Sequence, residues 1–289
     1  MHALIFLVGC AAPVAPGESV LGVDVPAEIL EGEAGDRLGA SVAAEGGRWM
    51  AAAPGAGITW VDGQPMDARS AWVGWWEGRE VLVNPEGTVT VDGEARWTVE
   101  GAHAWAIGDA GVLAATAEAL VFVDRERVIA VDGVESVAWG TGRALANVCR
   151  AGCEARAWTE DGEPLGAWAA AGEGGAVGEW DGVAWAGDPA WDDPEGAGKV
   201  CSEGGACVVG EPGDHVGAAI GGGYTAGTFN SRIVPPRARI VPLGDGLTYC
   251  MEEGAELQEI VLASADPLVI GAPYYPAHGE PSGAVLRVP

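Results

Sequence analysis

Residues 88–99 read Thr-Val-Thr-Val-Asp-Gly-Glu-Ala-Arg-Trp-Thr-Val. Two alternating runs of β-favouring residues flank Asp92-Gly93, a pair that favours the tight turn of a β-hairpin. Similar hairpins are predicted at 120–123 with 128–131, 199–201 with 206–209, and 239–241 with 247–250. Gly or Pro interrupts nearly every window in which a helix could form, so the sequence predicts an all-β protein.

A second short strand motif recurs along the chain and reveals an internal repeat. Six-residue windows of this motif start at residues 49, 80, 111, 143, 183, 224 and 268, so neighbouring starts lie 31 to 44 residues apart. Each window follows a strand of small and aromatic residues and precedes a hairpin. Four short strands in a repeat of this length match a propeller blade, and seven windows predict seven four-stranded blades.

The two ends of the chain complement each other. The seventh repeat ends after its third strand, at 282–288, and therefore lacks a fourth. Residues 27–41 align with 206–219, where a fourth strand leads into the first strand of the next repeat. We therefore expect a propeller over residues 27–289 in which an N-terminal strand completes the last blade and removes the open edge.

Three repeats resemble a known family. Residues 35–43 with 50–57, and 268–273 with 282–286, look like FG-GAP repeats of the integrin α-subunit propeller, and 213–217 repeats the opening half of that motif. The resemblance implies a seven-bladed integrin-like propeller. The calcium loops of that family have no counterpart here, because 44–47, 76–78 and 221–223 do not carry three spaced carboxylates.

The composition excludes several classes of function. The 289 residues include 42 acidic and 15 basic side chains, and the net charge of −27 argues against nucleic-acid binding. The 47 glycines and 18 prolines would suit a disordered chain, but 48% hydrophobic residues and 13 tryptophans indicate a folded core.

The N-terminus has the features of an exported lipoprotein. Residues 1–9 form a short apolar segment that we interpret as a signal peptide, and Leu7-Val8-Gly9-Cys10 resembles the lipobox in which a cysteine is acylated. Residues 10–26 are rich in small residues and proline, which predicts a tether. We expect lipidation (palmitate) at Cys10, an outer-membrane location facing the periplasm or the cell surface, and membrane contact through the anchor alone. The alternative is a buried apolar strand that contains Cys10.

The remaining cysteines suit an oxidising compartment. Cys149 with Cys153, and Cys201 with Cys207, are expected to form local disulfides, and Cys250 would be a buried free thiol. A metal site is the rival interpretation. The spacing of both pairs differs from the usual two-residue knuckle and no histidine lies near, so we favour disulfides.

Candidate residues for chemistry are few. His103, His215 and His278 fall in different repeats, and we identify no catalytic residues. The densest acidic loop, with Asp188, Asp192, Asp193 and Glu195, could hold Ca²⁺, although a solvated loop is favoured. No other cofactor is expected.

The tryptophans fall into two groups. Trp72, Trp105 and Trp139 recur at one position in consecutive repeats, which predicts packing between blades. Trp60, Trp75 and Trp76 are less regular and are expected to be partly exposed on one face, where they would contact a ligand.

The sequence therefore favours a non-enzymatic, monomeric envelope lipoprotein that acts as a binding or scaffold module for an unknown protein or glycan. The alternative is a carbohydrate-binding or hydrolytic propeller that uses exposed tryptophans and acidic loops. A periplasmic assembly factor would have the same sequence features.

Overall fold

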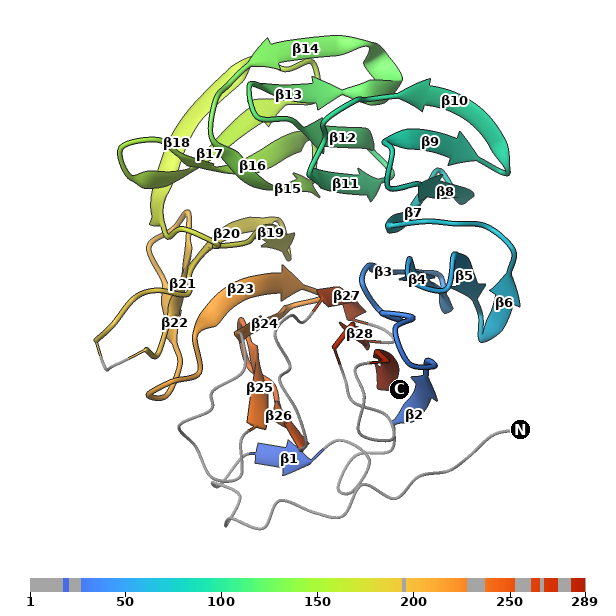
Figure 1. Ribbon diagram of the computed structural model, residues 1–289. Coiled ribbons are helices and arrows are strands. Elements are labelled where there is room, and N and C mark those ends of the chain that lie inside the picture. Colours follow the sequence, from blue (N-terminus) through green and yellow to red (C-terminus); the bar gives the residue numbers. More distant parts are fainter. Residues whose placement is uncertain are drawn as a thin grey trace.

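The computed structural model describes residues 18–20, 27–193, 196–227, 237–252, 261–265, 268–274 and 282–288. The described strands form seven sheets, antiparallel except for one added edge strand, that stand around a central axis like the blades of a propeller (Figure 1). Within these described residues the only helical element is a three-residue 3-10 turn, η1 (Val123–Arg125). The predicted all-β, seven-bladed fold with four-stranded blades is confirmed.

The first four blades follow the order of the chain, each running from the axis outward. Blade 1 is β3 (Val42–Glu45), β4 (Arg48–Ala53), β5 (Ile58–Val61) and β6 (Gln64–Met66). Blade 2 is β7 (Trp72–Trp76), β8 (Arg79–Val83), β9 (Thr88–Val91) and β10 (Glu94–Thr98). Blade 3 is β11 (Ala104–Gly108), β12 (Gly111–Ala115), β13 (Ala119–Phe122) and β14 (Arg127–Ala130). Blade 4 is β15 (Val134–Gly140), β16 (Arg143–Cys149), β17 (Cys153–Thr159) and β18 (Pro164–Ala171).

The last two blades include strands from the N-terminal part of the chain. Blade 5 is β19 (Val177–Trp180), β20 (Val183–Asp188), β21 (Lys199–Ser202) and β22 (Cys207–Val209). Blade 6 is β23 (Val216–Gly221), β24 (Tyr224–Gly227), β25 (Arg237–Pro242) and β26 (Thr248–Glu252), with β1 (Glu18–Val20) at its outer edge. Blade 7 is β27 (Val261–Ala265), β28 (Leu268–Ala272), β29 (Ala284–Val288) and β2 (Glu28–Glu31).

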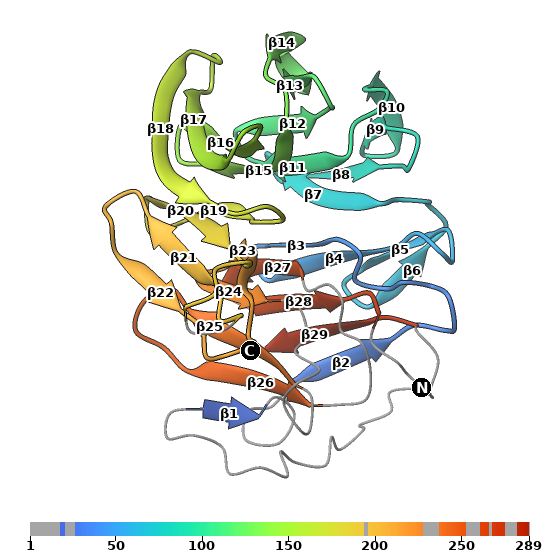
Figure 2. The same ribbon diagram turned by 60° about the vertical axis from the view of Figure 1, so that its left-hand side comes forward.

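The ring closes as the ends of the sequence predict. β2 pairs antiparallel with β29, with Leu30 opposite Val285, and Arg287 forms an ion pair with Glu28 at 3.1 Å (Figure 2). β1 was not foreseen. It pairs in parallel with β26, with Ser19 opposite Tyr249, inside the segment that the sequence suggests is a tether.

The aligned turns before blades 1 and 6 share one backbone conformation. Arg37 and His215 both have a positive φ, of 55° and 51°, and each follows a glycine of positive φ two positions earlier. In each turn an aspartate accepts a hydrogen bond from the backbone N–H three residues before it, Asp36 from Glu33 and Asp214 from Glu211, both at 2.8 Å. The alignment of 27–41 with 206–219 therefore reflects real structural equivalence.

The core lies mainly between blades. Trp105 packs with valines of blades 2 and 3, and its ring centroid lies 6.1 Å from that of Trp72 in the neighbouring blade. Trp139 of blade 4 meets Phe122 of blade 3 edge-on at 5.7 Å. The expectation that the repeated tryptophans pack between neighbouring blades is confirmed.

Both predicted disulfides are present. Cys149 is bonded to Cys153 across the β16–β17 loop, and Cys201 to Cys207 across the β21–β22 hairpin. Cys250 belongs to β26, and its side chain lies outside the described residues. In the part of the chain that the structure describes, no helix is long and apolar enough to cross a membrane.

Candidate functional site

A central channel of about 1160 Å³ lies among the described blades. The innermost strands β3, β7, β11, β15, β19, β23 and β27 line it. Much of the lining is alanine and glycine, because seven strands that converge on one axis leave little room for large side chains.

One side of the channel is aromatic. The tryptophans that line it all come from blades 2, 3 and 4, and they are Trp72, Trp75, Trp76, Trp105 and Trp139. Blades 1, 5 and 7 instead contribute smaller or aliphatic residues such as Ala43, Gly178 and Leu262. Trp75 and Trp105 are buried, whereas Trp72, Trp76 and Trp139 are partly exposed. The channel therefore has one aromatic wall, and its partly exposed rings suit the methylene stem of a long side chain or a cation.

Three carboxylates stand at one mouth of the channel. Glu45 ends β3, Glu77 and Asp109 lie in the turns that follow β7 and β11, and all three line the cavity. None of them forms an ion pair or a side-chain hydrogen bond with a described residue. We call these three residues the acidic rim.

The other carboxylates of the channel are paired. Arg125 lies within 3.6 Å of Asp124 and 3.4 Å of Glu160, so it links blade 3 to blade 4. Arg143 binds Glu179 at 3.1 Å. Burial raises the pKa of Glu179, but hydrogen bonds from Thr141 and Arg143 outweigh it and hold this pKa below its usual value. Unlike the acidic rim, these groups already have counterions.

The three tryptophans expected to contact a ligand differ in their surroundings. Trp75 is only 5% exposed, because it packs between blades 1 and 2 and the guanidinium of Arg48 lies 4.4 Å from its ring centroid. The expectation that Trp75 is partly exposed is wrong. Trp76 is half-buried, 5.6 Å from the ring of Trp97, and Trp60 is half-buried against the core between blades 7 and 1.

The acidic loop of blade 5 is held by its own contacts. Asp188 lies 3.8 Å from the ammonium of Lys199, and Asp192 accepts a hydrogen bond from the backbone N–H of Gly196 at 2.5 Å. Asp193 is exposed, and Glu195 lies outside the described residues. The described carboxylates of this loop are not gathered around a common point.

The two described histidines contact backbone carbonyls. His103 donates from Nε2 to the carbonyl of Val134 at 2.7 Å, and Nδ1 of His215 lies 3.1 Å from the carbonyl oxygen of Pro189. His278 lies outside the described residues.

The acidic rim was not predicted, although its residues form a visible pattern in the sequence. An acidic residue stands directly before the turn between the first two strands in three consecutive repeats, as Glu45-Gly46, Glu77-Gly78 and Asp109-Ala110.

Comparison with known proteins identifies the fold. No protein-family model and no curated protein match the chain. Among solved structures, the WD40 repeats of RRP9 align with a TM-score of 0.59 and 12% identity, over 91% of this chain and 97% of that one. The structure of U3-55K aligns with a TM-score of 0.58 and 11% identity, over 91% and 98%. The likeness is one of fold alone. Both matches support the seven-bladed propeller.

Proposed function

We propose that this chain is a non-enzymatic binding or scaffold module of the cell envelope. The propeller would be integrin-like, as the FG-GAP resemblance of residues 35–43 and 268–273 suggests, and anchored as an outer-membrane lipoprotein through Cys10. Two disulfides between neighbouring strands support an oxidising compartment.

The observation that carries the proposal is the acidic rim beside the aromatic wall. Carboxylates without counterions attract a basic partner, and nearby aromatic faces favour Arg and Lys side chains. Because the chain holds 42 acidic residues against 15 basic ones, its long-range field also attracts cations. We therefore assign the partner as a basic segment of an envelope protein that docks at the rim.

Binding of a decalysine peptide tests this assignment. The triple variant Glu45→Gln, Glu77→Gln, Asp109→Asn removes the rim charges and is expected to weaken binding about tenfold or more at low salt. The matched control is Asp67→Asn, Glu100→Gln, Glu118→Gln, which removes equal charge from exposed positions on the opposite face. Equal weakening in both triple variants would show that only net charge matters and would refute a rim site.

The anchor has a separate test. Radiolabelled palmitate should enter the full-length protein and should not enter Cys10→Ser. Incorporation that persists in Cys10→Ser, or none in the parent chain, would contradict the lipoprotein assignment. A glycan array with signals that vanish in Trp76→Ala would instead indicate the carbohydrate-binding alternative.

A further inference from the structure

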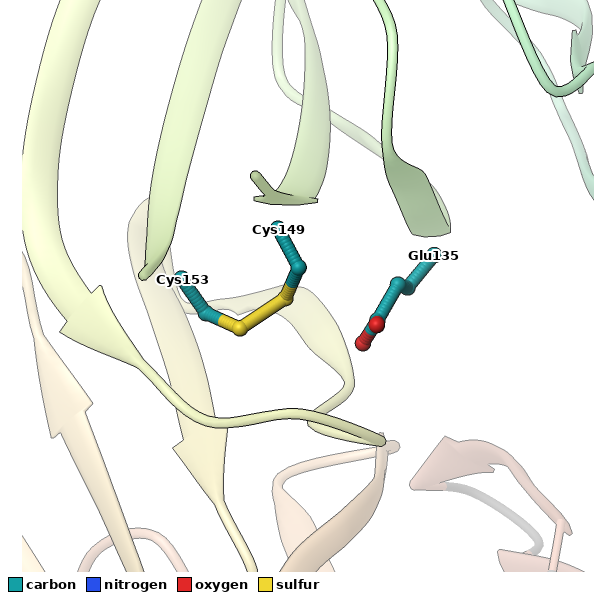
Figure 3. Close-up of side chains that lie close together, drawn as sticks. All are labelled: Glu135, Cys149 and Cys153. Atoms are coloured by element: carbon teal, nitrogen blue, oxygen red, sulfur yellow. A yellow bond between two sulfur atoms is a disulfide. The ribbon is translucent and has the colours of Figure 1, made fainter. Parts of the chain in front are cut away.

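One group of potential metal ligands stands out among the described residues. Glu135, Cys149 and Cys153 bring a carboxylate oxygen and two sulfurs within 4.8 Å of one another, and all three side chains are half-buried (Figure 3). They come from three adjacent strands, β15, β16 and β17. Two thiolates and one carboxylate are a donor set that Zn²⁺ accepts.

A β-bulge places the carboxylate. Along β15, Val134 pairs with Val148 and Ser136 with Asn147, so Glu135 is the extra residue between two adjacent pairs. A bulge redirects a side chain that regular alternation would send elsewhere. The carboxylate of Glu135 is held there by a hydrogen bond from the backbone N–H of Gly174, at 2.8 Å.

Strand register places the two sulfurs. Cys149 and Cys153 face each other at the end of the β16–β17 pair, with their Cα atoms 4.1 Å apart. The three-residue spacing that argued against a zinc knuckle is therefore no obstacle, because strand pairing aligns the cysteines.

The surroundings of the cluster do not depend on the disulfide bond. Asn147 is fully buried, and its amide donates to the carbonyls of Gly172 and Gly175 at 2.9 and 3.0 Å. Its Oδ1 lies 3.8 Å from the sulfur of Cys149. Strand pairing sets the backbone positions of the two cysteines, and the N–H of Gly174 holds Glu135, so the three ligands should stay in place after reduction.

We propose that Glu135, Cys149 and Cys153 form a redox-gated binding site for a thiophilic divalent cation such as Zn²⁺. In the disulfide state the sulfurs are bonded to each other and offer no thiolate. A dithiol reductant gives two electrons and two protons, breaks the S–S bond, forms two thiols and itself becomes a disulfide. Binding of Zn²⁺ then releases two thiol protons, and a water completes four-coordination beside the carboxylate.

The second disulfide is an internal control. Cys201 and Cys207 also face each other at a hairpin, with Cα atoms 4.2 Å apart. Within the described residues, no third ligand gathers around them. The proposal thus predicts that one cysteine pair binds the cation and the other does not, and it does not depend on the proposed envelope function.

The test measures the Zn²⁺ affinity of full-length protein by competition with a chromophoric chelator, before and after reduction by a phosphine. Cys201→Ser/Cys207→Ser should bind one equivalent when reduced and none when oxidised. Cys149→Ser/Cys153→Ser should lose that equivalent. Cys10 and Cys250 are present in both variants, so their contribution cancels.

The carboxylate is tested in the Cys201→Ser/Cys207→Ser background. Glu135→Gln should weaken Zn²⁺ binding about tenfold or more, whereas Glu154→Gln, beside Cys153 but paired with Arg156, should leave it unchanged. Equal affinity of Glu135→Gln and its parent, or tight binding that persists in Cys149→Ser/Cys153→Ser, would overturn the proposal. If Glu135→Gln or Cys149→Ser/Cys153→Ser fails to fold by circular dichroism, thiolate-to-Cd²⁺ charge-transfer absorption of Cys201→Ser/Cys207→Ser decides: a band for two thiolates must appear on reduction, and its absence refutes the site.

Discussion

Both guanidinium NH₂ groups of Arg143 donate hydrogen bonds to the carboxylate of Glu203, Nη1 to Oε2 at 2.7 Å and Nη2 to Oε1 at 2.8 Å. The pair joins blade 4 to blade 5 across 60 residues of sequence. Arg143 also donates to Glu179 and to the carbonyl of Gly182, and its side chain is only 18% exposed. One arginine therefore binds four oxygen atoms from three residues of the next blade.

Arg143→Ala should lower the free energy of unfolding by about 2 to 3 kcal/mol, because it removes the two-pronged contact with Glu203 and takes the guanidinium away from the half-buried carboxylate of Glu179. Arg143→Lys should recover only part of the loss, since an ammonium cannot form the two-pronged contact. Urea unfolding measures both. The control is Arg96→Ala, whose exposed pair with Glu94 should contribute less than about 1 kcal/mol. A similar loss in both alanine variants would contradict the prediction.

The same network should make stability depend on pH. A hydrogen bond from Arg143 lowers the pKa of Glu203, and burial of Glu179 is outweighed by hydrogen bonds that lower its pKa too. Groups with lowered native pKa values stabilise the fold above their unfolded pKa of 4.5, and this stabilisation disappears as pH falls through the native values. The stability difference between the parent and Arg143→Ala should therefore shrink below about pH 4.5. Parallel curves of unfolding free energy against pH would contradict this.

Gly39→Ala should disturb the junction between blades 7 and 1. Gly39 has a φ of +88°, and an added Cβ would lie 2.5 Å from the carbonyl oxygen of Ala284. Gly35 has nearly the same φ, +85°, with nothing within 4 Å of the added carbon. Gly35→Ala should thus report backbone strain alone, about 1 kcal/mol, and Gly39→Ala should cost about 1 to 3 kcal/mol more. Equal melting temperatures for the two variants would show that the contact with blade 7 relaxes freely.

Trp105→Ala should be among the most damaging single substitutions. The side chain is 9% exposed and packs between Val81 of blade 2 and Val112 of blade 3. Removing it leaves a cavity between blades and should cost about 3 to 5 kcal/mol. Val128→Ala is the contrasting surface change, because Val128 is 66% exposed and its loss should stay within about 0.5 kcal/mol. Denaturant titration would contradict the prediction if the two losses were similar.

The repeat could be predicted because each blade carries its own local signals. Asp92-Gly93 connects β9 and β10 as its sequence indicates, with Asp92 at a φ of 50° and Gly93 at 79°. The closure of the ring could also be predicted, because the sequence around Arg37 matches the sequence around His215. The two turns also share a positive φ at these residues.

Features that depend on contacts with a neighbouring strand or blade could not be predicted from the sequence. Trp75 looks like a surface residue along β7, and it is buried because residues of the neighbouring blade, such as Arg48 and Met50, pack against it. β1 was missed because parallel pairing with β26 requires no turn signal between the two strands. Glu135 was not predicted as a ligand because a bulge changes the direction of its side chain. The alternation of residues along a regular strand does not predict this change.

The N-terminal strands also determine how the protein would bear a mechanical load. A pull applied upstream of residue 18 reaches β1 first, which is held by three residue pairs at the outer edge of blade 6. Only after β1 separates would tension reach β2, whose four pairs close the ring in blade 7. β1 would therefore detach from β26 first, and the chain between β1 and β2 would extend while the pairing of β2 with β29 keeps the ring closed.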